Sequence, residues 1–242
     1  IILFDSTGVG KSEGEIPTTF QGWAANAIAL LKALEVPKID LLGFSMGGMA
    51  VQFVYLQAPG LVCKLILAGT CTSGNPSFVK GGLDFYFGLA NPISEEDFYT
   101  GWARSFFSNT PHGQAVAKVS WQRIFSRAQD RAPQLHPELA KRQAQARATF
   151  GKPHPDNPFE RIAEFKIPVF VANGDNDLLI PTQNSVELAR ILPHAHLHIY
   201  PNSGHGFLFQ YAELFAKHVD LFLNGDDGGL EGETEKVMAR LA

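Results

Sequence analysis

The chain has 242 residues, of which 45% are hydrophobic and 18% are charged, and its formal net charge at pH 7 is −4. This length and apolar content are enough for one large globular domain with a buried core. The negative charge argues against a nucleic-acid partner, because phosphate binding needs a basic face. No apolar stretch reaches the roughly 18 residues that cross a bilayer, so no membrane span is expected.

The chain begins with an apolar run, residues 1–4, that is bounded by Asp5. Such a short run predicts a strand buried on both faces. No initiator Met and no signal peptide precede it, so any targeting segment would lie upstream, and a cytoplasmic location is expected. Two cysteines are too few for a disulfide framework, and Cys63 is expected to be packed beside an apolar strand.

Strands and helices alternate in the first third of the chain. A helix is predicted to follow a capping-box signal that begins at Thr18. Residues 39–44 then predict a buried strand, residues 46–57 a helix, and residues 65–68 another strand. This alternation favours a parallel sheet covered by helices. One face of the first helix is predicted to carry Trp23, Ala27, Leu31 and Leu34.

The alternation resumes near the far end. Residues 168–172 predict a strand, residues 182–192 a helix, and residues 197–200 a further strand. A last apolar helix face runs from about Phe209 to Phe222 and stops at an Asn-Gly pair.

The sequence thus divides into an α/β core, residues 1–71 and 165–225, and a helical insertion, residues 72–164, placed over one end of the sheet. The acidic, Gly-rich residues 226–242 are expected to form a mobile tail. The insertion is rich in aromatic side chains, of which two or three are expected to face a cleft. These are Phe85, Tyr86, Phe87, Phe98, Tyr99, Trp102, Phe106, Phe107, Trp121 and Phe125.

Residues 43–47 match the motif G-x-S-x-G, and Ser45 lies between a predicted strand and a predicted helix, as a nucleophile elbow requires. Gly43 and Gly47 are expected where larger side chains would collide with the neighbouring strand and helix. The following helix directs its first N–H groups at the same place, which favours a developing oxyanion. The alternative is a glycine-rich turn with an incidental serine.

A serine hydroxyl needs a base to take its proton, and the base needs a carboxylate to orient it. Asp175 and Asp177 follow the strand at residues 168–172, and His205 follows the next strand between two glycines. All three side chains are therefore expected at the sheet edge where Ser45 stands. Either carboxylate could serve as the acid on this ground alone.

These features resemble the α/β-hydrolase superfamily over residues 1–70 and about 167–223. Residues 5–12 are similar to the family's D-x-x-G-x-G-x-S segment, with Thr7 where an arginine is frequent. A nucleophilic serine separates the chain from the relatives that use aspartate, which are epoxide hydrolases and haloalkane dehalogenases. Esterases, C–C bond hydrolases, lactonases and cofactor-free perhydrolases remain open.

The resemblance assigns roles to individual residues. It implies a catalytic triad of Ser45, Asp177 and His205, in which Asp177 occupies the family's G-x-x-D position and Asp175 caps the turn. The backbone N–H of Met46 is implied as one oxyanion-hole donor.

The resemblance also implies the fold class, which is α/β, a mostly parallel sheet flanked by helices that lacks its first three strands and carries an inserted helical cap. In the family, a loop among those strands supplies the second oxyanion donor, and losing one donor costs about a hundred- to a thousand-fold in rate. Lowered activity is therefore expected. Residues 1–4 should pair directly with residues 39–44, or leave a gap of about 4.8 Å.

The implied activity is hydrolysis of an ester or related carbonyl substrate by two-step acyl transfer. The substrate is expected to be a small apolar or aromatic acyl compound, and no cofactor or metal is needed. The alternative, from another functional class, is a catalytically silent relative that binds a small apolar ligand under the cap.

Two other patterns suggest different chemistry. Residues 8–12 resemble a nucleotide-binding P-loop, but Asp5 stands where that motif needs glycine, and Gly14 and Pro17 interrupt the helix that should follow.

The other pattern is the alternation of His194, His196 and His198, which is typical of metal ligands on one strand face. No carboxylate or cysteine nearby completes a set, so surface histidines at a sheet edge are the favoured interpretation.

Overall fold

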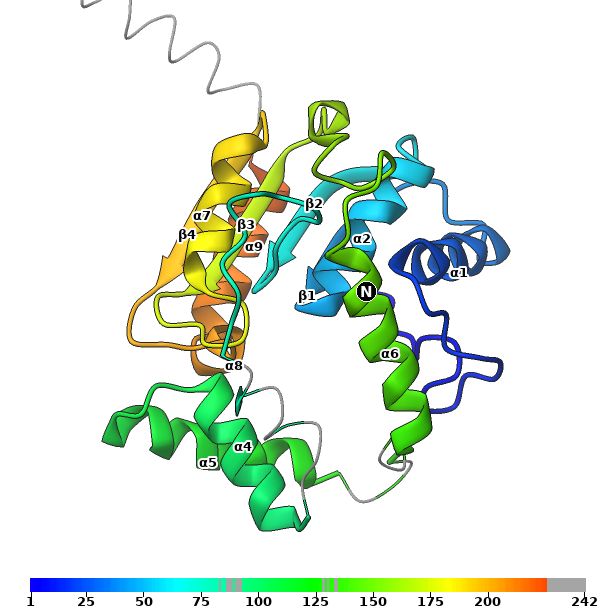
Figure 1. Ribbon diagram of the computed structural model, residues 1–242. Helices are drawn as coiled ribbons and strands as arrows, with labels where there is room; N and C mark the ends of the chain where they lie inside the picture. The colour runs from blue at the N-terminus through cyan, green and yellow to red at the C-terminus, as the bar shows by residue number, and fades with distance from the viewer. Residues whose placement is uncertain are drawn as a thin grey trace, which may run out of the picture.

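The computed structural model describes residues 1–82, 84–85, 89, 93–127, 129, 131–132 and 135–225. Among these residues, four strands form one sheet in the order β1-β2-β3-β4, and every neighbouring pair is parallel (Figure 1). The predicted α/β architecture is therefore confirmed. The strands are β1 (Ile39–Phe44), β2 (Val62–Ala68), β3 (Val169–Gly174) and β4 (Ala195–Tyr200).

Helices cover both faces of the sheet. One face carries α1 (Phe20–Ala33), α2 (Met46–Gln57) and α7 (Thr182–Ile191). The other face carries α8 (Phe207–Gln210) and α9 (Ala212–Asn224), which are separated at Tyr211 where a single last helix was predicted.

The two-sided covering follows from the strand sequences. Successive side chains of a strand point to opposite faces, so a strand buried on both sides is apolar throughout. In β2, Leu65 and Leu67 join the core beneath α2, whereas Ile66 and Ala68 join the core beneath α9. The same division holds in β3, where Phe170 faces α9. Both central strands are thus fixed by packing from two sides.

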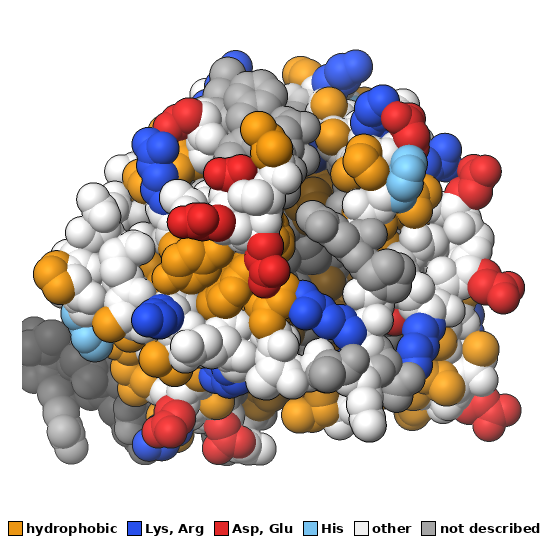
Figure 2. All heavy atoms as spheres, turned by 90° about the horizontal axis from the view of Figure 1, so that it is seen from below, with side chains coloured by type: hydrophobic (Ala, Val, Ile, Leu, Met, Phe, Trp, Pro, Cys, Tyr) orange, Lys and Arg blue, Asp and Glu red, His pale blue; other side chains and the backbone are white. Residues whose placement is uncertain are grey.

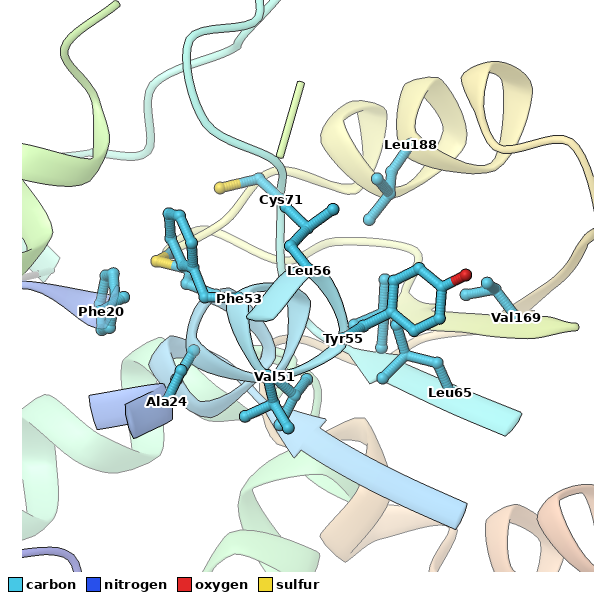
Figure 3. Close-up of a cluster of buried hydrophobic side chains, with 14 of the residues drawn as sticks. Phe20, Ala24, Val51, Phe53, Tyr55, Leu56, Leu65, Cys71, Val169 and Leu188 are labelled. Atoms are coloured by element: carbon cyan, nitrogen blue, oxygen red, sulfur yellow. The ribbon is translucent and has the colours of Figure 1, made fainter. Parts of the chain in front are cut away.

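Helix α2 lies at the centre of the larger core. Figure 3 shows its Phe53 directed towards Phe20 of α1, while its Tyr55 lies beside Leu65 and Val169 of the sheet. The Tyr55 hydroxyl donates to the carbonyl of Glu164 at 3.0 Å and accepts from Lys166 N–H at 3.1 Å. The helix that follows Ser45 is therefore held on all sides, which gives the serine a rigid support.

The described part of the segment between β2 and β3 contains helices and no strand. Its elements are α4 (Glu95–Phe106), α5 (Pro111–Phe125), α6 (Pro137–Phe150) and the short 3-10 helix η1 (Ile162–Glu164). In Figure 1, α4 and α5 lie next to α8 at the end of the sheet, whereas α6 lies beside α1. Arg142 ties α6 to the loop before α1. It donates to the carbonyl of Ile16 at 2.7 Å and pairs with Glu15 at 3.1 Å.

The expected strand at residues 1–4 is not formed. The residues are exposed, with Leu3 at 91% exposure, and β1 pairs only with β2 within the described part of the chain. An apolar run predicts burial but supplies no ladder partner, and a strand needs one for its backbone groups. The following residues instead close a turn on Asp5, whose Oδ2 accepts from Lys11 N–H at 3.0 Å.

Two local predictions are also wrong. Thr19, one residue after the expected position, caps α1 by accepting from Gly22 N–H at 3.2 Å. Of the predicted apolar face, Leu31 is buried and Trp23 and Ala27 are partly buried, but Leu34 lies just past the helix end and is 51% exposed. Cys63 is exposed rather than packed, because it lies at the start of β2 before the strand is covered on both sides. The predicted tail at residues 226–242 lies outside the described residues.

None of the helices in the described ranges is both long enough and apolar enough to cross a bilayer.

Candidate active site

Ser45 stands on a strained turn between β1 and α2. Its backbone has φ 55° and ψ −121°, in a region that residues other than glycine rarely adopt. The turn is tied to the neighbouring strand, because Ser45 N–H donates to the carbonyl of Ala68 at 2.9 Å. The Thr70 hydroxyl donates to the carbonyl of Ser45, also at 2.9 Å. Hydrogen bonds from β2 and its loop therefore hold the serine backbone in place.

The glycines around Ser45 differ in what they permit. A Cβ on Gly43 would lie 2.5 Å from the carbonyl oxygen of Gly47, and one on Gly48 would lie 2.6 Å from Cβ of Thr70. A Cβ on Gly47 would meet nothing within 4 Å. The steric expectation therefore holds for Gly43 and is wrong for Gly47. The close approach of helix and loop falls instead on Gly48, which the motif does not specify.

The N-terminus of α2 is open towards the serine. Ser45 is the N-cap residue, and its side chain makes no capping hydrogen bond. The first N–H groups of an α-helix have no partner within the helix, and they carry partial positive charge. Met46 is the first helical residue, so its N–H is among these groups.

Asp177 and His205 form a buried pair. Asp177 Oδ2 lies 2.6 Å from His205 Nδ1, and the side chains are 0% and 1% exposed. The other carboxylate oxygen of Asp177 accepts from Leu179 N–H at 2.9 Å and from Ile180 N–H at 2.8 Å. The carboxylate accepts, so the imidazole donates from Nδ1 and leaves Nε2 for a second partner.

Asp175 has a different set of partners. Its two carboxylate oxygens accept from Asn202 N–H at 2.8 Å and from Ser203 N–H at 3.0 Å. It therefore ties the turn after β3 to the loop that leads into His205. The structure brings Asp177, and not Asp175, to the imidazole.

The imidazole is enclosed by side chains from other elements. The ring of Phe44, the residue before the serine, lies 4.8 Å from the His205 ring, and the ring of Phe106 lies 5.1 Å from it on an edge-to-face contact. Gly69, at φ 53°, leaves room for the ring, because a Cβ there would lie 3.3 Å from His205 Nδ1. These contacts place His205 beside the turn that carries Ser45. Within the described part of the chain, no hydrogen bond joins the Ser45 hydroxyl to the imidazole.

The sequence did not single out Phe44, Gly48, Gly69 or Thr70. Their only local signal is position, since each lies within three residues of Ser45 or directly after β2. Phe106 was named among the insertion's aromatic residues without a role. Most of the other described ones pack against each other around Trp102 and Trp121, and Tyr86 and Phe87 lie outside the described residues.

The P-loop-like segment at residues 5–12 has no room for a phosphate. In residues 5–12, the Asp5 carboxylate fills the turn that a phosphate would need, and a Cβ on Gly10 would lie 2.3 Å from its Oδ2. The next helix, α1, begins only at Phe20, so this loop does not lead directly into a helix N-terminus as a P-loop does.

His194 is exposed just before β4, the outermost strand of the described sheet, as expected, whereas His196 and His198 are half-buried against α9. His198 stacks on Phe170 at 4.4 Å and lies 5.0 Å from His218, while His196 contacts Phe222. Burial and the neighbouring His218 and His196 lower the pKa of His198. In the residues that the structure covers, no group of three or more His, Cys, Asp or Glu side chains could hold a metal ion.

The end of the molecule near α4 and α8 is hollowed. Figure 2, seen from below Figure 1, shows a recess near the centre of this face, with hydrophobic side chains inside it and to its left. The carboxyl ends of the strands lie on this side, as the path of the chain from β4 through His205 into α8 shows. Parallel sheets bind ligands at this edge.

Comparisons with known proteins agree on one family. A model of the alpha/beta hydrolase fold matches residues 1–211. A 2-hydroxymuconate semialdehyde hydrolase of Pseudomonas putida is 25% identical over 232 residues, which cover 92% of this chain and 76% of that protein. A 2-hydroxy-6-oxononadienedioate/2-hydroxy-6-oxononatrienedioate hydrolase of Dechloromonas aromatica is 28% identical over 231 residues, covering 92% and 75%.

A solved structure agrees as well. An alpha/beta hydrolase fold protein from Chitinophaga pinensis superposes with a TM-score of 0.80 at 30% identity, covering 92% of this chain and 78% of that one. Because the family model spans most of the chain and the sheet, the chain belongs to the alpha/beta hydrolase fold family.

Proposed function

We propose that the chain is a serine hydrolase that cleaves an ester or related carbonyl substrate by acyl transfer. Ser45 is the nucleophile, His205 the general base, and Asp177 the carboxylate that orients the base. The observation that carries the proposal is the buried Asp177–His205 pair, 2.6 Å apart, beside a serine on a strained turn. The relatives named above are hydrolases, which supports the same reaction class.

The order of proton transfers follows from the tautomer. With Nδ1–H donated to Asp177, the free Nε2 of His205 takes the hydroxyl proton as Ser45 Oγ attacks the carbonyl carbon. The imidazolium then returns this proton to the leaving group, and an acyl-serine ester remains. Water attacks that ester, His205 again takes a proton, and the serine is regenerated with release of the acid. Asp177 stays ionised throughout.

The developing oxyanion needs donors on the side of the serine that faces the helix. We assign Met46 N–H to this role, because it is the first residue of α2 and the helix lacks a side-chain cap. One such donor contributes about a hundred- to a thousand-fold in rate.

The helical segment supplies the substrate side of the proposed site. We propose that residues 72–164 form a cap over a core made of residues 1–71 and 165–225. Phe44 and Phe106 on either side of the imidazole, with the apolar recess in Figure 2, favour a small substrate with an apolar or aromatic acyl part.

A second candidate is a catalytically silent protein that binds a small apolar ligand in the same recess. It is favoured by one observation: in the described residues, the Ser45 hydroxyl makes no hydrogen bond to His205. Catalytic hydrogen bonds are often long in ligand-free sites and shorten on substrate binding. The hydrolase therefore remains the better-supported function.

Turnover of p-nitrophenyl butyrate separates the two candidates. The hydrolase predicts release of p-nitrophenolate that is abolished in Ser45→Ala and kept in Ser126→Ala, an exposed serine beyond the end of α5. Both variants should keep the wild-type unfolding temperature. A folded wild-type protein with no turnover, whose binding of the ester is the same in Ser45→Ala, would favour the silent binder instead.

A further inference from the structure

The last residue of α4, Phe106, contacts the loop that carries His205 in two ways. Its ring lies 5.1 Å from the imidazole at an interplanar angle of 87°. Its carbonyl oxygen accepts from Gly206 N–H at 2.7 Å. A residue more than ninety positions away in sequence thus contacts both the side chain and the backbone of the His205 loop.

The two glycines on either side of His205, Gly204 and Gly206, both lie close to the backbone of Phe106. A Cβ on Gly206 would lie 2.8 Å from the carbonyl oxygen of Phe106, and one on Gly204 would lie 3.0 Å from the same atom. Neither glycine has a positive φ, so backbone strain does not explain them. The close approach of the α4 end does.

The hydrogen bond to Asp177 restrains the imidazole at one atom. A hydrogen bond tolerates a range of angles, so small combined rotations about the two side-chain torsions of His205 can still tilt the ring around Nδ1. Packing on the ring faces is needed to aim Nε2. Phe44 covers the ring at a tilt of 34°, and Phe106 closes the other direction edge-on. Together with Asp177 they leave His205 1% exposed.

We propose that Phe106 is a positioning residue for His205: through its ring and its carbonyl oxygen, the end of α4 holds the imidazole so that Nε2 faces the serine. The proposal rests on the hydrolase function for its kinetic consequence, but its structural consequence is independent of turnover. In this arrangement the helical insertion covers the site and also orients the general base, His205.

Phe107 provides a matched control. It is the next residue, is 2% exposed, and packs on Trp102 at 5.0 Å, and among the described residues its ring makes no ring contact with His205. Phe107→Leu therefore also removes an aromatic ring at the end of α4, from a position at least as buried as that of Phe106. If Phe106 acted only through general packing, the two substitutions would have similar effects on the imidazole.

The test uses the full chain as wild type and in three variants, Phe106→Leu, Phe106→Tyr and Phe107→Leu, with His205→Ala as a reference for the assignment. The first readout is the downfield proton resonance of the His205 Nδ1–H, identified by its loss in His205→Ala. We expect it to broaden or disappear in Phe106→Leu and to remain in Phe106→Tyr, which keeps the ring, and in Phe107→Leu. An unchanged resonance in Phe106→Leu, or its loss in Phe107→Leu as well, would overturn the proposal.

The second readout is the split between kcat and KM for an active wild type. Misplacing a catalytic group by about 1 Å costs on the order of a hundred-fold. We expect kcat of Phe106→Leu to fall about ten- to a hundred-fold with KM within about two-fold, and Phe106→Tyr to recover most of the loss. A rise in KM at constant kcat would instead assign Phe106 to substrate binding. An inactive wild type that keeps the resonance pattern would reject the hydrolase function and leave the positioning role standing.

Discussion

The loop that carries Ser45 and the loop that carries His205 reach the same edge of the sheet by different means. The serine turn packs within itself, with Gly43 against Gly47, and against the loop after the adjacent strand β2, with Gly48 against Thr70. The His205 loop depends on distant parts of the chain: Asp177 from the loop after β3, Phe44 from β1, and Phe106 from α4. The serine turn depends on its own residues and on one adjacent strand with its loop, whereas the His205 loop depends on three separate parts of the chain.

This difference predicts where each loop is vulnerable. The serine turn should fail through backbone and packing changes within it, with consequences for stability. The His205 loop should fail through substitutions far from it in sequence, with consequences for chemistry and smaller effects on folding. Substitutions can separate the two expectations.

The largest effect is expected at the carboxylate. Asp177→Asn keeps the shape of the side chain but favours the wrong imidazole tautomer, so we expect kcat to fall about 10⁴-fold. Asp175→Asn is the matched control, because within the described ranges its carboxylate bonds only the backbone of residues 202 and 203. It should lower the unfolding temperature with a far smaller loss in kcat. Steady-state kinetics with thermal unfolding would check both, and equal losses in kcat would contradict the assignment of the acid.

An intermediate effect is expected from the glycines of the serine turn. Gly43→Ala would overpack the turn against the Gly47 carbonyl, which costs about 1–3 kcal/mol in free energy of unfolding. Gly47→Ala meets open space in a helix, where alanine is favoured over glycine by up to about 1 kcal/mol. Urea unfolding of the two variants measures the difference. Equal destabilisation by both would mean that the close packing of Gly43 against Gly47 does not hold the turn.

The elements of the core were largely predictable from sequence, and the reason is physical. The bounds of α2 were predicted closely because a motif marks its start and a Pro-Gly pair follows its end. The central strands are apolar on both faces, which gives a strong signal. Residues 1–4 gave the same signal and formed no strand, because composition reports the preference for burial and not the presence of a partner.

The site was predictable only in part. The order of serine, acid and histidine along the chain can be inferred from loops that follow strands. The contact of Phe106 with His205 could not, because helical periodicity in the insertion does not indicate which ring reaches the sheet edge. Gly204 and Gly206 carried a local signal, yet the neighbour that requires them is visible only in the fold.

The smallest effect is expected in the alkylation of the two cysteines. Its rate at Cys71 measures how often the buried region beside the serine turn opens. Burial raises the pKa of the Cys71 thiol to about 12, and this residue follows Thr70, whose hydroxyl holds the Ser45 carbonyl. The thiolate is the reactive form, so Cys71 should resist iodoacetamide at pH 8 while the exposed Cys63 reacts. Mass spectrometry of the alkylated peptides gives the ratio. Comparable labelling of both thiols in native protein would mean that this part of the core opens readily.

The most direct test of the account is covalent labelling of the folded protein with a fluorophosphonate, followed by peptide mapping. The account predicts one adduct, on Ser45, that forms far more slowly in His205→Ala because the base is gone. A folded wild-type protein that takes no label, or that takes it on another serine, would contradict the assignment of Ser45 as an activated nucleophile.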